Sequence, residues 1–199
     1  MQPYLTTGGA SDPFLPRLLA AIRQANRIDL AVAFIKSSGL ALAYPAQVDA
    51  VETRDAQLRI LTSDYLDVTD PQALRRLMLL AERGADIRVF EAGQQSFHLK
   101  AYICTQNSSG QTVWGAAFVG SSNLSRTALT DGLEWNLRVD WTDDPAAPDA
   151  RRFCELNAEY ATLQAHPQVR RLDHDWIEHY EQRRQQVQRL PVAVDAAAP

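Results

Sequence analysis

The order of strand-like and helix-like segments is the feature that most constrains the fold. Short apolar runs alternate with stretches that repeat apolar residues at helical spacing up to about residue 90, and strand-like runs then follow one another. This order is typical of an α/β sandwich. The sequence therefore predicts a mixed central β-sheet flanked by helices, with extra C-terminal helices after the last strand.

The expected elements form one domain. Six strands are expected, at residues 28–35, 58–65, 85–92, 97–104, 112–120 and 132–141. Helices are expected from Pro13 to Ala25, from Gly39 to Ala56 with an interruption at Pro45, and from Asp70 to Gly84. We expect a single domain over residues 1–190, with a core at about 14–141 and helices at about 149–190, broken near His166 and Pro167. Residues 191–199 have the Pro/Ala-rich composition of a linker.

Composition limits the kind of partner that the chain can bind. Its 199 residues are 46% hydrophobic and carry a net charge of −4. This charge excludes nucleic-acid binding through a positive charge spread over the whole surface. A polyanion would have to be held by a local cluster. The arginine pairs at 151–152, 170–171 and 183–184 are interpreted as helix faces balanced by nearby acids, and contact with a nucleic-acid backbone is the alternative. The sequence has two cysteines, which are expected to be free thiols. It has no apolar run long enough for a membrane span and no signal-peptide pattern, so a cytoplasmic protein is expected.

The segment FHLKAYIC, residues 97–104, places two basic side chains on one side of an expected strand. His98 and Lys100 alternate with Phe97 and Leu99. Side chains two residues apart on a strand are separated by about 6.5–7 Å. Two such groups repel each other unless an anion lies between them. The pattern therefore predicts an anion site, although a solvent-facing strand without a role is the alternative.

A polar turn follows the strand at 112–120. Gly120 permits a sharp turn, and Ser121, Ser122, Asn123 and Ser125 offer hydroxyls, an amide and backbone N–H groups. Such a set suits a phosphate, whereas the alternative is a simple helix cap.

Together, the two segments resemble the phospholipase D superfamily. His98-Leu99-Lys100 matches its H-x-K element and Gly120-Ser121-Ser122-Asn123 its G-S-x-N element. The stretches 62–77 and 120–136 are similar to the phospholipase D-like domain at the N-terminus of bacterial DEAD/DEAH-type helicases and related restriction-associated proteins. The resemblance covers roughly residues 14–141, and it implies that the tail leads toward a helicase part.

The resemblance also implies roles for particular residues. His98 would be the nucleophile on phosphorus, Lys100 and Asn123 would hold phosphate oxygens, and Ser121 and Ser122 would complete the cradle. The superfamily's H-x-K-x4-D pattern places an aspartate where this chain has Thr105. Glu134 is the expected substitute, and a salt bridge to Arg138 or Lys100 is its alternative role.

No cofactor or metal is expected. His174 and His179 are five residues apart, which is poor spacing for one helical face, and lysine and amide groups would supply the electrostatic stabilisation.

The chain carries one copy of the motif, and single-copy members of the superfamily pair two subunits. We therefore expect a homodimer that cleaves a phosphodiester, with DNA as the expected substrate, in association with a helicase and away from membranes. Two alternatives stay open. One is a module that binds DNA or phosphate without cleaving it, because the aspartate is missing. The other is a lipid-directed phospholipase, which the lack of a membrane-seeking segment disfavours.

Overall fold

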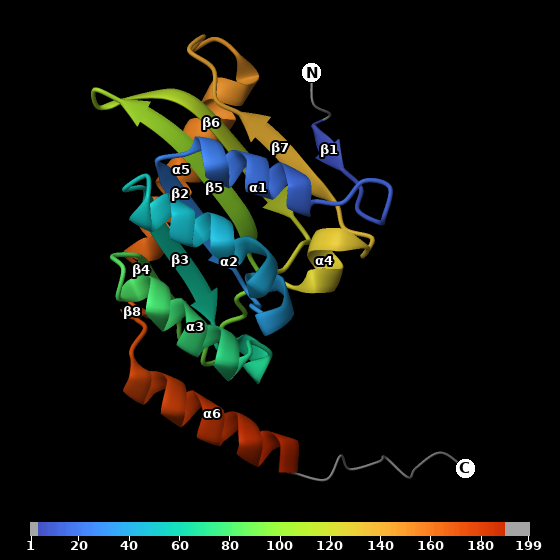
Figure 1. The fold of residues 1–199 in the computed structure, drawn as a ribbon, viewed down its shortest axis with the longest axis vertical. Helices are drawn as coiled ribbons and strands as arrows, with labels where there is room; N and C mark the ends of the chain where they lie inside the picture. The colour runs from blue at the N-terminus through green and yellow to red at the C-terminus, as the bar shows by residue number, and fades with distance from the viewer. Residues whose placement is uncertain (1–3, 190–199) are drawn as a thin grey trace.

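The computed structural model describes residues 4–189, with side chains to residue 187. The predicted linker at 191–199 lies outside these residues. At the centre is an eight-stranded sheet in the order β1-β7-β6-β5-β2-β3-β4-β8 (Figure 1). Strands β2, β3 and β4 pair in parallel, and the other neighbours pair antiparallel. The prediction of a mixed α/β sheet is confirmed.

The elements have the following bounds. The strands are β1 (Leu5–Thr6), β2 (Arg27–Val32), β3 (Gln57–Ser63), β4 (Asp86–Phe90), β5 (Lys100–Ser108), β6 (Gln111–Gly120), β7 (Asn136–Asp140) and β8 (Val169–Arg171). The helices are α1 (Leu15–Gln24), α2 (Ser37–Glu52), α3 (Pro71–Ala81), α4 (Arg126–Thr130), α5 (Pro148–Gln164) and α6 (His174–Arg189), and a 3-10 turn, η1, lies at Tyr65–Asp67.

Helices cover both faces of the sheet. Helices α1, α2 and α3 lie side by side across one face (Figure 1), and their apolar residues form the main core with the sheet side chains Tyr102 and Cys104. Helix α5 covers the other face, where Phe153 and Tyr160 pack against Ile103. The period-two alternation predicted for residues 101–104 is therefore confirmed, since neighbouring side chains enter different cores.

Helix α2 contradicts one expectation. Pro45 lies inside it without interrupting it. Proline removes one backbone hydrogen bond from a helix, but α2 buries Leu40, Ala43 and Ala46 against the sheet, and this tertiary packing outweighs the local preference.

Two strands and some boundaries also differ from the sequence prediction. The short edge strands β1 and β8 were not expected, because pairs of two or three residues leave no periodic signal. Strand β5 begins at Lys100 and extends beyond residue 104 to Ser108, and β7 begins at Asn136. His98 and Glu134 therefore lie just outside the strands, at the same edge of the sheet.

The turn after β6 crosses over β5 and joins the end of β2. The Leu124 N–H donates to the Phe34 carbonyl oxygen over 3.2 Å, and the Lys36 N–H donates to the Leu124 carbonyl oxygen over 2.9 Å. We call this pair of contacts the Leu124 bridge. Leu124 and Ile35 are fully buried in the main core beneath it, so apolar burial and backbone pairing fix the turn together.

No helix within residues 4–189 combines the length and the hydrophobicity that crossing a membrane requires.

Gly39 allows α2 to approach the Leu124 bridge. A Cβ atom at residue 39 would lie 2.4 Å from the backbone of Leu124. Although alanine is favoured in helices by about 1 kcal/mol, we expect Gly39→Ala to lower the free energy of unfolding by about 1–3 kcal/mol through this clash. Urea denaturation would measure the change. Ser38 is exposed and its hydroxyl accepts only a long hydrogen bond, 3.5 Å, from the Arg126 N–H, so Ser38→Ala should shift the free energy by less than about 0.5 kcal/mol. Equal effects of the two variants would contradict the prediction.

Candidate active site

The two motifs meet where four strand ends lie together. Lys100, the first residue of β5, pairs with Val32, the last residue of β2. Gly120, the last residue of β6, pairs with Asn136, the first residue of β7. Strands β7, β6, β5 and β2 are consecutive in the sheet. The residues at these strand ends therefore lie together at one end of the sheet.

His98 and Lys100 contact each other directly. The Lys100 Nζ lies 2.8 Å from His98 Nδ1 and donates to the His98 carbonyl oxygen over 2.9 Å. Lys100 is only 5% exposed, whereas the His98 ring is exposed. None of the hydrogen bonds found for residues 4–189 engages His98 Nε2. This nitrogen is therefore available to an incoming group.

Burial makes the Lys100 ammonium responsive to negative charge. Loss of hydration lowers the pKa of Lys100, and the negative charge of Glu134 acts in the opposite direction. The Phe34 ring also faces the ammonium, with its centroid 5.8 Å from Nζ, and packs edge-on against the His98 ring at 5.5 Å. A buried cation in this setting favours binding of an anion that completes its coordination.

The backbone of the G-S-x-N turn is held close to β7. The Ser121 N–H donates to the Trp135 carbonyl oxygen over 3.0 Å. A Cβ at position 120 would lie 2.0 Å from the same oxygen, so only glycine fits there. Glycine at position 120, predicted from the sequence for a sharp turn, thus allows the turn to lie close to the backbone of Trp135.

Ser122 is fully buried and its hydroxyl is used within the fold. Its Oγ accepts from Asn136 Nδ2 over 2.8 Å and donates to the Ala128 carbonyl oxygen over 3.2 Å. The Tyr102 hydroxyl donates to the Ser122 carbonyl oxygen over 2.9 Å, and burial raises the pKa of Tyr102, which keeps this donor protonated. Ser122, expected as a phosphate ligand, is placed to fix the turn.

Asn123 is oriented by the end of β2. Its Oδ1 accepts the Phe34 N–H over 3.2 Å, and no hydrogen bond described for the chain engages its Nδ2. Because the acceptor end of the amide is fixed, the donor end remains for a ligand.

Glu134 contacts Ser121. The Ser121 hydroxyl donates to a carboxylate oxygen of Glu134 and accepts the Trp135 N–H over 3.1 Å. Among the contacts of residues 4–189, none joins Glu134 to His98. Glu134 instead influences Lys100 through its charge, and Arg138 pairs with Asp140 at 2.6 Å. The role of Glu134 in orienting His98 stays a prediction.

Thr105 lies away from the site. It is 3% exposed in the middle of β5, opposite Arg27 and Gly115. Five residues along a strand span about 16 Å, so an aspartate at position 105 would not reach the Lys100 ammonium. The departure from the H-x-K-x4-D pattern therefore removes no carboxylate from this edge.

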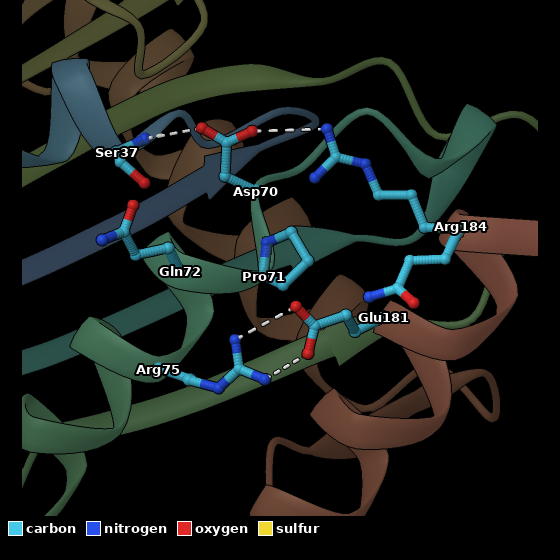
Figure 2. A pocket seen from close by; sticks show the side chains of 8 residues that line it. Ser37, Asp70, Pro71, Gln72, Arg75, Glu181 and Arg184 are labelled. Carbon is cyan, nitrogen blue, oxygen red and sulfur yellow. Dashed lines mark hydrogen bonds and ion pairs between the residues drawn. The ribbon is translucent and has the colours of Figure 1, made fainter. Parts of the chain in front are cut away.

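A polar cleft of about 430 Å³ lies between α3 and α6 (Figure 2). Asp70 accepts from the Ser37 N–H over 3.0 Å and from Arg184 over 3.4 Å, and Glu181 accepts two hydrogen bonds from Arg75. Both arginines thus face carboxylates. Arg184 therefore ties α6 to the start of α3, and its partner is a carboxylate of another element, not one of the neighbouring acids on α6.

The described residues contain no cluster of three or more His, Cys, Asp or Glu side chains that could hold a metal ion.

A histidine and a lysine at one strand end, facing a G-S-x-N turn on a mixed sheet, define the phospholipase D class of α/β phosphodiesterase folds. Comparison with known proteins agrees. The family model described as "Cardiolipin synthase, PLD-like domain" matches residues 18–155. The chain belongs to this family of phospholipase D-like domains.

Solved structures show the same fold. The phospholipase D family member Nuc from Salmonella typhimurium superposes with a TM-score of 0.61 and 17% identity, over 86% of this chain and 99% of Nuc. Polyphosphate kinase from Porphyromonas gingivalis gives a TM-score of 0.54 at 14% identity, over 77% of this chain and 24% of the kinase. No curated protein matches significantly in sequence.

The charge of Glu134 should be visible in the titration of Lys100. The chain has two lysines, Lys36 and Lys100. The lysine side-chain NMR signal that remains in Lys36→Arg therefore belongs to Lys100. We expect Glu134→Gln to lower the pKa of Lys100 further, because the attraction that opposes desolvation is removed. Asp140→Asn, a carboxylate paired with Arg138, is the control and should leave it unchanged. An unaltered Lys100 pKa in Glu134→Gln would contradict this electrostatic coupling.

Proposed function

We propose that the protein is a metal-independent phosphodiesterase, a DNA nuclease domain that works with a helicase. The observation that carries the proposal is that His98 Nε2, which no described hydrogen bond engages, lies at the same strand ends as two donors, the Lys100 ammonium and Asn123 Nδ2. DNA and the helicase rest on the resemblance of residues 62–77 and 120–136 to helicase-associated domains. The family match supports phosphodiester chemistry in general.

The reaction proceeds in two displacements. His98 Nε2 attacks phosphorus, an Nε2–P bond forms, and the bond to the leaving oxygen breaks as that oxygen takes a proton from a general acid. Water, deprotonated by a general base, then attacks phosphorus, breaks the N–P bond and restores the imidazole. Lys100 and Asn123 stabilise the charge that grows on the non-bridging oxygens.

Substrate binding prepares the nucleophile. In the structure the Lys100 ammonium lies against Nδ1, so a neutral imidazole carries its proton on Nε2 and is not nucleophilic there. A phosphate attracts the ammonium to its oxygens. The ring proton then moves through water from Nε2 to Nδ1, whose N–H donates a hydrogen bond to a carboxylate, for which Glu134 is the candidate, and Nε2 presents its lone pair.

A second copy of the chain supplies the general acid and base. The chain has a single H-x-K element, and a twofold axis at the site brings a second His98 to the same phosphate. An exposed apolar patch at the same strand ends, on the α5 face of the sheet and so on the opposite face from Lys100, offers a contact surface for this second copy. It consists of Leu99, Val119, Trp135 and Leu137, exposed by 39–67%. Val119 and Leu137 are cross-strand neighbours, so the patch is continuous.

The alternative function is a DNA- or phosphate-binding module of a helicase or restriction-type system that does not cleave. Two observations favour it: Glu134 accepts the Ser121 hydroxyl, and the Lys100 ammonium lies against His98 Nδ1. If this arrangement persists with a ligand, the site holds phosphate without activating the nucleophile.

Replacing His98 separates the two functions. In EDTA, wild-type protein should cleave labelled single- or double-stranded DNA, and His98→Ala should reduce the rate by at least about a thousandfold because the nucleophile is lost. His174→Ala, an exposed histidine on α6, is the matched control and should retain full activity. Cleavage that survives in His98→Ala would reject the proposal. Salt-sensitive binding without cleavage, weakened by Lys100→Ala, would support the binding module.

Charge placed in the apolar patch tests the dimer. We expect Leu137→Lys to convert the dimer to a monomer and to abolish cleavage, because burying an unpaired ammonium opposes association. Size-exclusion chromatography with light scattering measures the mass. Val113→Lys is the control, since Val113 and Leu137 are both 52% exposed and Val113 lies toward the opposite end of β6. A wild-type monomer, or a dimer that tolerates Leu137→Lys, would overturn the shared site.

A further inference from the structure

A row of aromatic rings extends from His98 along the edge of the sheet. The Phe34 ring packs edge-on against His98, with centroids 5.5 Å apart. The Tyr65 ring lies parallel to Phe34 within 8°, at a centroid distance of 6.4 Å. Both residues are partly exposed. Tyr65, which the sequence did not indicate, is thus two ring contacts from the nucleophile.

The loop that carries Tyr65 has an unusual backbone. Leu66 and Asp67 have φ values of 58° and 52°, a region that residues other than glycine rarely adopt. Arg183 of α6 holds the loop by donating to Asp67 over 2.7 Å and to Asp64 over 3.0 Å. The loop leaves Leu66 68% exposed next to Tyr65. Strain of this kind persists where surrounding contacts enforce it, and it concentrates at binding sites.

Tyr65 forms one wall of a hollow of about 500 Å³. Its lining comprises Asp64, Tyr65, Leu66, Asp67, Glu91, Ala92, Gly93 and Arg183. The lining has three carboxylates and one guanidinium; Arg183 pairs with Asp64 and Asp67, and Arg170, outside the lining, pairs with Glu91 at 3.3 Å. One negative charge is left over, which disfavours a phosphate in the hollow. Carboxylates accept N–H groups, and an aromatic face stacks on a planar ring. The hollow therefore fits the chemistry of a nucleobase and not that of the backbone.

We propose that Tyr65, with Leu66, stacks on the base next to the phosphate held at His98, and that the substrate is single-stranded nucleic acid. The proposal rests on the proposed function and deepens it by naming the substrate class. In a duplex, both faces of each base are covered by its neighbours and its edge is paired. A single strand offers a base that turns into the hollow while its phosphate stays beside Lys100.

The test compares strands with and without bases. His98→Ala protein, which does not consume the probe, is titrated with a fluorescent oligothymidylate and with an oligonucleotide of equal length built from abasic residues. We expect tighter binding of the base-bearing strand. Adding Tyr65→Ala should weaken that binding by about 5- to 100-fold, the usual effect of losing one aromatic stacking contact, and leave the abasic strand unaffected. Tyr65→Phe keeps the ring and should bind like the parent.

The outcomes also separate this proposal from the proposed function. Base-dependent binding through Tyr65 supports stacking even if the wild type cleaves nothing. Cleavage by the wild type with no effect of Tyr65→Ala on the base-bearing strand overturns stacking and leaves the nuclease intact. Equal weakening of both strands by Tyr65→Ala would also overturn it, because the residue would then act through the fold. Competition by phosphocholine that requires Tyr65, without discrimination between the strands, would assign the hollow to a cationic head group instead.

Discussion

The Leu124 bridge is the constraint on which the site depends. The turn after β6 crosses β5 and hydrogen-bonds to the end of β2 through Leu124. Residues far apart in the sequence therefore lie together near Lys100 at the start of β5. The same crossing sets Asn123 against the Phe34 N–H and orients its amide. Gly39 and Gly120 permit the two close backbone approaches that flank the bridge. The position of the proposed phosphate cradle is therefore a consequence of backbone packing.

Local charge, and not overall charge, makes the site suitable for an anion. The chain is net negative, yet Lys100 is nearly buried, and its hydration is replaced by His98, the Phe34 face and the field of Glu134. None of these neutralises it fully. A phosphate oxygen would do so, which links binding to the release of His98 Nδ1. The same lysine thus accounts for affinity and for activation in the proposed mechanism.

Much of this arrangement could be predicted from the sequence, because it depends on local pattern. The order of strands and helices indicated the mixed sheet. The alternation in residues 97–104 and the glycine of the turn predicted that the two motifs lie at neighbouring strand ends. The rest depends on contacts between distant segments. Helix α2 continues through Pro45 because its apolar side chains are buried. Glu134 contacts Ser121 and not His98. Tyr65 lies near the site because α6 holds its loop in place.

The most direct test of the central claim is a search for the covalent intermediate. Wild-type protein would be mixed with a strand that carries ³²P at an internal phosphate, quenched within one turnover and separated under denaturing conditions. The account predicts label attached to the protein through an acid-labile, alkali-stable bond that maps to His98 and is absent from His98→Ala. Turnover without labelled protein, or label that persists in His98→Ala, would contradict it.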